Sequence, residues 1–452
     1  MIAYSRLLRN NPGFARLWLA QVVSLTGDWF TTIVLSTIIA DFSDGSGIAI
    51  SLFLLARFVP PLIFGPFAGV LVDRYDRRKI LMYSNVIRVF VVLGFLLATS
   101  PDRLWIIYVL TVLQFSLSAL FEPGQSAITP SIVHRDDLVK ANTLASITWS
   151  TMLAVGALIG GLISALFGPV VAIVVDAITF AVAAFILSTI HERHQITNPP
   201  QADGSDIAEA DEDGSFLEGL RYLRKRPATL AVTLVKGAGS IGNVDLLMTV
   251  FATQIFILGN NGSLSLGIMY SAFGIGAFLG PLLLNRFHDG SIFKMRRVIA
   301  VGFVLAILGW VLLGSAQTLL IAAVALAVRA MGGSANWTYS AVILQKSVPD
   351  RYLGRVFSLD IAFFQLITVL STLVHGFAVD VMTAQKTYQA FEQVALVGNV
   401  ADSLALIVPG NPAVRVISYV TAVVAILPLL GWMWVLATMQ KRQDARVAAE
   451  AA

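Results

Sequence analysis

The sequence has 452 residues, of which 57% are hydrophobic and 13% are charged, and its formal net charge at pH 7 is +4. Soluble domains carry fewer apolar residues and about twice this share of charged ones, so the composition indicates a protein that crosses a membrane many times and disfavours one large soluble core. The absence of cysteine excludes a disulfide framework, a thiolate metal site and a cysteine nucleophile.

Runs of about 20 apolar residues predict twelve membrane-spanning helices. Along the chain they cover approximately residues 14–40, 48–72, 80–100, 104–126, 143–167, 169–190, 228–258, 264–285, 298–315, 318–345, 357–380 and 412–438. The first run is not a cleaved signal peptide, because it is too long, contains Asp28 and is followed by no small-residue cleavage site.

The positions of Lys and Arg predict that both termini lie in the cytoplasm. With that orientation most of the 31 basic residues lie in cytoplasmic segments, whereas the basic residues of the outer segments are Arg103, Lys386 and Arg415. This asymmetry follows the positive-inside rule. The net positive charge is therefore a signal of topology, and nucleic acid is not expected as a partner.

A change of composition after the sixth span divides the chain into two halves. Residues 195–215 are rich in Asp and Glu and contain no Lys or Arg, which predicts a disordered acidic linker. The apolar residues after it recur at helical spacing opposite basic ones, which predicts an amphipathic helix on the inner membrane surface. We therefore expect an N-terminal six-helix bundle over residues 1–190, the cytoplasmic linker and surface helix over 191–227, and a C-terminal six-helix bundle with a cytoplasmic tail over 228–452.

The two halves repeat each other weakly. The second span ends with Gly65, Gly69, Asp73 and Arg74, and the eighth ends at nearly the same spacing with Gly276, Gly280, Asn285 and Arg286. A duplicated six-span unit is typical of transporters in which two bundles enclose a site near the middle of the membrane. The expected fold class is all-α and integral to the membrane, with twelve transmembrane helices in two pseudo-symmetric six-helix bundles.

The loop after the second span resembles the signature loop of the major facilitator superfamily, through Gly69, Asp73, Arg74, Arg77, Arg78 and Lys79. Asp76 stands where that family has Gly, so a tight turn is not predicted there. In the fifth span Gly156, Gly160 and Gly161 are similar to the G-P-x-x-G-G element of the antiporters, with Ala157 in place of Pro. The stretches LWLAQVVSLTGDWF and FEPGQSAITPSIVHRDDLVKANTL resemble the macrolide-efflux and enterobactin-export branch of drug:proton antiporters.

The resemblance implies a cytoplasmic gate that latches the two bundles when the cavity faces outward. Asp73 would pair with an Arg or with the N-terminus of a neighbouring helix, while Arg77 or Arg78 would reach Glu122 on the fourth span. The gate would then consist of Gly69, Asp73, Arg74, Arg77, Arg78 and Glu122. The alternative is that the basic residues only set the topology.

Charged residues inside spans cost about 2.5–3.5 kcal/mol each on insertion scales, so function is the first hypothesis for them. The set expected for proton coupling and the substrate cavity is Asp28, Arg57, Asp176, Lys236, Asp245 and Arg329. Helical rise places Asp28 and Arg57 at a similar depth, and we expect them to pair. Arg88 and Asp360 lie nearer the inner surface, where a structural role is favoured. For the whole set, the alternative is buried ion pairs that lock helices together.

These features predict a secondary active exporter of amphipathic organic molecules, drug-like or siderophore-like, that exchanges them for protons by alternating access. Because Lys236 and Arg329 make the C half basic, substrates with an anionic or neutral polar group are favoured. We expect a monomer among the lipids of the bacterial cytoplasmic membrane, with neither cofactor nor metal. A lysophospholipid or lipid transporter, and a receptor or scaffold that transports nothing, are the alternatives. A membrane-embedded enzyme is disfavoured, because no phosphate loop, metalloprotease motif or nucleophile elbow is present.

Overall fold

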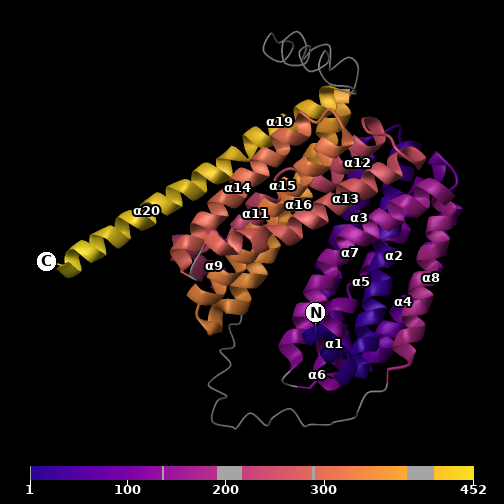
Figure 1. The fold of residues 1–452 in the computed structure, drawn as a ribbon, viewed down its shortest axis with the longest axis horizontal. Helices are drawn as coiled ribbons and strands as arrows, with labels where there is room; N and C mark the ends of the chain where they lie inside the picture. The colour runs from indigo at the N-terminus through magenta and orange to yellow at the C-terminus, as the bar shows by residue number, and fades with distance from the viewer. Residues whose placement is uncertain (1, 135–136, 191–215, 288–290, 384–411, 452) are drawn as a thin grey trace.

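The computed structural model of the protein describes residues 2–134, 137–190, 216–287, 291–383 and 412–451, and within them the regular elements are all helices (Figure 1). The N-terminal half consists of α1 (Ile2–Asn10), α2 (Pro12–Phe42), α3 (Gly47–Arg74), α4 (Arg77–Gly94), α5 (Leu104–Ser118), α6 (Phe121–Ile132), α7 (Leu138–Phe167) and α8 (Pro169–Ser188). The C-terminal half consists of α9 (Phe216–Arg224), α10 (Pro227–Thr233), α11 (Val235–Gly239), α12 (Val244–Gln254), α13 (Ser263–Leu284), α14 (Ile292–Gly314), α15 (Leu319–Ser347), α16 (Asp350–Thr383), α19 (Pro412–Val424) and α20 (Ile426–Ala451).

The prediction of twelve spans in two bundles is confirmed. Eleven helical stretches of the described chain are long and apolar enough to cross a membrane. The fourth crossing is made by α5 and α6 in succession, with a break at Ala119 and Leu120. Neither piece alone has the length of about 20 residues that a spanning helix needs, but together they do.

Helix starts follow ordinary local chemistry. Proline occupies the first turn of α2, α8 and α10, where its missing N–H removes no helical hydrogen bond. Side-chain oxygens of Ser46, Asn243, Ser291 and Thr318 accept backbone N–H groups at the starts of α3, α12, α14 and α15. These caps satisfy N–H groups that have no partner inside the helix.

The two bundles touch at one end of the molecule and separate toward the other. Figure 1 shows α7 beside α13 and α3 beside α16 near the loop after α12, whereas α6 and α9 lie apart at the opposite end. We call the end that carries α6, α9 and the turn between α3 and α4 the inner end, and the opposite end the outer end. The N-terminal helix α1 lies at the inner end (Figure 1).

A helix is present after the predicted linker, as α9, and protein covers part of its apolar face. Leu223 is fully buried, and the Tyr222 ring stacks on Tyr352 with a centroid separation of 4.5 Å. Arg355 of α16 pairs with Glu218 at 2.6 Å. The helix therefore contacts the inner end of α16, while Leu220 is 41% exposed, and its place at the inner membrane surface stays a prediction. The predicted acidic linker, residues 195–215, lies outside the described residues.

The orientation in the membrane stays a prediction, and the absence of natural cysteines makes it directly measurable. Single cysteines are expected to react with an impermeant thiol reagent added outside the cell in the variants Asp102→Cys and Gln317→Cys, at exposed outer-end positions. Asp76→Cys and Lys225→Cys, at exposed inner-end positions, are expected to react only after the membrane is opened. If Asp76→Cys and Lys225→Cys both reacted from outside, the predicted orientation would be wrong.

Candidate functional site

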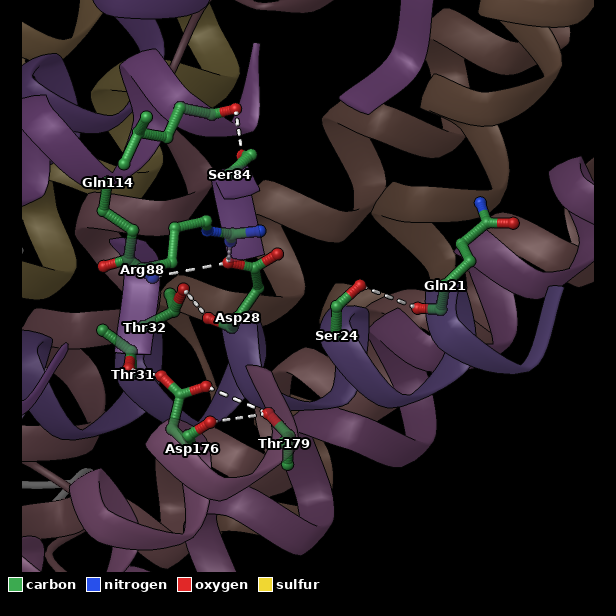
Figure 2. Close-up of polar contacts among 11 residues, drawn as sticks. Gln21, Ser24, Asp28, Thr31, Thr32, Ser84, Arg88, Gln114, Asp176 and Thr179 are labelled. Carbon is green, nitrogen blue, oxygen red and sulfur yellow. Dashed lines mark hydrogen bonds and ion pairs between the residues drawn. The ribbon is translucent and has the colours of Figure 1, made fainter. Parts of the chain in front are cut away.

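A buried polar cluster lies inside the N bundle, where α2, α4 and α5 meet (Figure 2). The guanidinium of Arg88 donates through Nη2 to Oδ1 of Asp28, and the Gln114 amide lies 3.4 Å from the same oxygen. The Arg88 side chain is 2% exposed and its guanidinium stacks 3.9 Å from the centre of the Phe180 ring. Asp28 is thus held by one cation and one amide in surroundings that exclude most water.

Asp176 of α8 is a second buried carboxyl group beside this cluster (Figure 2). It is fully buried, and the Thr31 hydroxyl of α2 donates to its Oδ2 while the Thr179 hydroxyl lies 3.3 Å from its Oδ1. Among the described residues its hydrogen-bond partners are hydroxyls and not cations. An isolated carboxylate is costly to bury, so the charge of the two acids has to be balanced by Arg88 or by a proton.

Arg57, the expected partner of Asp28, lies nearby without a described hydrogen bond or ion pair to it, and Arg88 makes that contact instead. The Arg57 guanidinium lies 4.9 Å from the Trp29 ring centre, 5.5 Å from that of Phe58 and 5.4 Å from that of Phe115. Its Nη1 atom is buried and has no hydrogen-bond partner among the described residues. Arg57 therefore makes cation–π contacts with three aromatic rings and does not form the expected hydrogen bond with Asp28.

Asp28 and Arg88 are in contact and therefore lie at the same depth, whereas the sequence predicts Arg88 nearer the inner surface. The 31 residues of α2 span about 46 Å, more than the apolar core of a membrane, so counting from the first residue of α2 overstates the depth of Asp28. The useful signal was periodicity. Gln21, Ser24, Asp28 and Thr31 recur at helical spacing on α2, and Ser84 and Arg88 do so on α4, which marks two polar faces inside apolar spans.

In the C bundle, Lys236 and Asp360 form a buried ion pair that the sequence did not predict. Nζ of Lys236 lies 2.5 Å from Oδ2 of Asp360, and the side chains are 3% and 0% exposed. The Lys236 ammonium also lies 4.4 Å from the Trp337 ring centre. The charge of Lys236 is balanced within its own bundle, so it no longer supports a preference for anionic substrates.

Asp245 and Arg329 take separate partners. The Tyr270 hydroxyl donates to Oδ1 of Asp245 at 2.8 Å, and the Tyr270 ring lies 5.3 Å from that of Trp29 in the N bundle. Arg329 donates weakly to the Gly239 carbonyl at 3.4 Å and lies 4.9 Å from the Trp310 ring centre. Trp29 and Tyr270 therefore form an aromatic contact between the two halves. Arg57 lies against Trp29 on the N side of this contact, and Asp245 accepts from Tyr270 on the C side.

The predicted seventh span, 228–258, is interrupted near its middle. α11 ends at Gly239 and α12 begins at Val244, with Gly242 at φ +82° between them. Side chains replace the missing helical bonds: Ser371 accepts from the Gly242 N–H at 2.9 Å, and Asn243 donates to Thr372 at 2.5 Å. Broken helices at mid-membrane are typical of transporter binding sites, and the run GAGSIGN was the signal for this one.

The glycines of the fifth span divide their contacts between the two bundles. Gly156 and Gly160 face α2, where an added Cβ would lie 3.3 Å from Trp29 and 2.8 Å from Phe30. Gly161 faces α13 of the other bundle, where an added Cβ would lie 2.6 Å from the Ser263 carbonyl oxygen and 3.0 Å from Cα of Gly267. The backbones of α7 and α13 therefore touch across the bundle interface, as small residues allow.

Polar contacts between the outer-end loops join the same two halves. The Gln254 amide donates to the Gly45 carbonyl at 3.1 Å, and the Asn260 amide donates to the Ser164 carbonyl at 3.0 Å. With the α7–α13 crossing they close the outer end.

At the inner end, the turn between α3 and α4 is built around Asp76. Its φ is −57°, and its carboxylate accepts the Lys79 N–H at 3.0 Å as the N-cap of α4, so no glycine is needed there. Arg78 donates to the Ile190 carbonyl at 2.5 Å, and Arg74 is exposed. The backbones of Gly69, Asp73 and Glu122 lie in helices, but the side chains of Asp73 and Glu122 lie outside the described residues, and the expected latch between them stays a prediction.

The loop after α6 is tied to the start of α2. Asn11 accepts the His134 N–H at 3.0 Å and lies 3.3 Å from Asp137, which Lys140 contacts at 2.7 Å. The hydrogen bond from Lys140 holds the pKa of the Asp137 carboxyl below its ordinary value. These contacts fix the inner end of the N bundle.

Comparison with known proteins gives concordant results. The Major Facilitator Superfamily matches residues 17–383. An uncharacterized MFS-type transporter of Bacillus subtilis is 27% identical over 226 residues, which cover 50% of this chain and 52% of that protein. Macrolide efflux protein A of Streptococcus pyogenes is 27% identical over 76% of this chain and 84% of its own length. The enterobactin exporter of Shigella boydii is 25% identical over 77% and 81%.

The fold is also that of solved transporter structures. A bacterial homolog of the human lysosomal transporter Spinster, in an inward-facing and unoccupied conformation, has a TM-score of 0.67 at 16% identity and covers 95% of this chain and 97% of its own. At this identity the likeness concerns the fold alone.

Proposed function

Because the chain belongs to the major facilitator superfamily, we propose that it is a secondary active exporter of amphipathic organic molecules, driven by protons that move the other way. Relatives named as macrolide and enterobactin exporters support an outward direction and a drug-like or siderophore-like substrate. The expected location is the bacterial cytoplasmic membrane, with both termini inside.

The observation that carries the proposal is a pair of carboxyl groups inside the N bundle, Asp28 and Asp176, of which only Asp28 has a hydrogen-bonded arginine in the described structure. A carboxyl group that exchanges its proton as its surroundings are hydrated and dehydrated can couple transport to a proton gradient. Arg88 provides the counter-charge when Asp28 is ionised. We propose Asp28 as the main coupling group.

The substrate is proposed to lie between the bundles, at the level of the aromatic pair Trp29 and Tyr270. The residues proposed around it are Asp28, Arg57, Asp176, Lys236, Asp245 and Arg329, with Lys236 acting as half of an ion pair. Arg57 has a buried N–H without a partner among the described residues, so it is the cation best placed to meet an acceptor group of the substrate.

The arrangement of the bundles supports alternating access. The halves touch at the outer end and separate at the inner end, so the proposed cavity faces the cytoplasm in this state (Figure 1). The opposite state would need the outer contacts to part and an inner gate to form. For that gate we propose Gly69, Asp73, Arg74, Arg77, Arg78 and Glu122. We propose that Gly161 lies at the α7–α13 contact that parts, and that Gly156 and Gly160 allow α7 to shift against α2.

A thermal-shift screen of purified protein tests the proposal. A ligand present at 100 times its dissociation constant is expected to stabilise the folded protein by about 2.7 kcal/mol. Macrolides and siderophores are expected to raise the unfolding temperature, and Arg57→Ala is expected to reduce that rise without changing the unfolding temperature of the free protein greatly. A rise with lysophospholipids alone would favour the lipid-transport alternative, and no rise with any class would favour a receptor or scaffold.

A further inference from the structure

A carboxylate of the C bundle caps a helix of the N bundle at the outer end. Asp380, near the end of α16, accepts the backbone N–H of Gly47 at 2.5 Å and that of Ile48 at 3.2 Å. The Ser46 hydroxyl lies 3.0 Å from the same side chain. One side chain from the eleventh span therefore takes up the first two free N–H groups of the second.

The amino end of α3 needs such a group from elsewhere. The first four N–H groups of a helix have no partner inside it, and the helix dipole favours a negative charge beside them. α3 has 28 residues and no acidic residue in its own first turn, and its Ser46 cap satisfies only the Ala49 N–H. Asp380 supplies both the acceptors and the charge, across the boundary between the bundles.

The helices are packed closely enough to make this contact specific. An added Cβ on Gly47 would lie 2.6 Å from Cβ of Val379, and one on Gly376 would lie 2.6 Å from the Gly47 carbonyl oxygen. One turn further, the Ser51 hydroxyl donates to the Thr372 carbonyl at 2.9 Å. α3 and α16 meet backbone to backbone, so Asp380 can reach the helix end only while the outer end is closed.

We propose that Asp380 is the latch of the outer end: its bonds to the amino end of α3 hold the two bundles together, and they part whenever the protein opens outward. The inference rests on the proposed alternating access but not on any substrate or on proton coupling. When the bundles separate, water can satisfy both the helix end and the carboxylate, so the latch can release and reform.

The test uses a reporter cysteine on the other helix crossing, so that it measures opening of the whole outer end. Ser263 of α13 is fully buried, its carbonyl faces Gly161, and its hydroxyl has no hydrogen-bond partner among the described residues, so Ser263→Cys loses no described bond. The rate of reaction with a thiol reagent is measured in purified protein. Adding Asp380→Asn is expected to raise the rate roughly 10-fold, and Asp380→Ala at least as much, because charge-assisted hydrogen bonds are lost.

Two controls separate opening from unfolding. Ser418→Cys places a reporter in α19, where the side chain is also fully buried and its hydroxyl also lacks a described partner. It is expected to stay unreactive when Asp380 is changed. Asp102→Asn removes an exposed outer carboxylate and is expected to leave the Ser263→Cys rate unchanged. Unchanged reactivity of Ser263→Cys in both Asp380 variants, or equal gains at Ser263→Cys and Ser418→Cys, would overturn the latch. Failure of the ligand screen would not alter this result.

Discussion

Asp28→Asn is expected to abolish export driven by a pH difference while substrate binding and substrate exchange continue. The asparagine keeps the Oδ1 acceptor that Arg88 and Gln114 contact, so the local packing is preserved. It can no longer take up a proton, so the link between the proton gradient and the cavity is lost. Reconstituted vesicles with an imposed pH difference measure the first activity, and exchange of labelled substrate without a gradient measures the second.

The energy available through one proton is sufficient for the proposed task. A proton that moves inward down about 100 mV supplies about 2.3 kcal/mol, and one pH unit adds about 1.4. The sum of about 3.7 kcal/mol supports a substrate gradient of a few hundredfold for one-for-one exchange of a neutral molecule. Loss of coupling should therefore remove an easily measured gradient.

A matched set of variants locates the coupling group. Asp102→Asn changes an exposed carboxylate outside the bundle cores and should transport like the unaltered protein. Arg88→Ala should impair both coupling and binding, because it leaves Asp28 without its described cation and removes the contact with Phe180. If Asp28→Asn still built a substrate gradient, Asp28 would not be the proton-coupling group, and Asp176 or Asp245 would be the next candidates.

Asp360→Ala is expected to destabilise the C bundle by about 3–5 kcal/mol, because it leaves the Lys236 ammonium buried without its partner. The double variant Lys236→Met with Asp360→Leu should recover most of this loss, since an apolar pair removes both the charges and the cost of burying them. Denaturant titration of the protein in detergent measures the free energy of unfolding.

An ion pair near the surface provides the control for this experiment. Lys140 and Asp137 are 2.7 Å apart, but the Lys140 side chain is 49% exposed. Lys140→Met is therefore expected to cost no more than about 1 kcal/mol. A similar small loss for Asp360→Ala would mean that water reaches Lys236, and would return that residue to the candidates for substrate contact.

The sequence was sufficient for the global architecture because the membrane restricts what can cross it. A long apolar run has to become a helix, and basic loops predict its direction, so the twelve spans and two bundles follow from composition and order. Helix interruptions were harder. We predicted α5 and α6 as one span because the apolar run continues through Ala119, and we predicted the seventh span as continuous because apolar residues flank the glycine-rich run GAGSIGN on both sides.

Partners of buried charges could not be predicted for a different reason. The sequence indicates that a charge is buried, but its partner depends on how helices rotate about their axes and slide along them. Helical rise placed Arg57 and not Arg88 at the depth of Asp28, and the positions of α2 and α4 along their axes bring Arg88 to Asp28. The contacts of Asp380 could not be predicted either. Its partners are backbone N–H groups of a helix more than 300 positions away along the chain.

The groups that close the outer end affect how often this end opens during the transport cycle. The polar ones are backbone carbonyls, amides and one carboxylate, whose bonds water replaces almost one for one when the halves part. Glycine contacts also immobilise no long side chains, so few rotamers are frozen on closing or freed on opening. These polar and glycine contacts therefore contribute little to the difference in free energy between the shut and open forms. The frequency of opening can therefore be tuned by natural selection in single hydrogen bonds, without rebuilding the bundles.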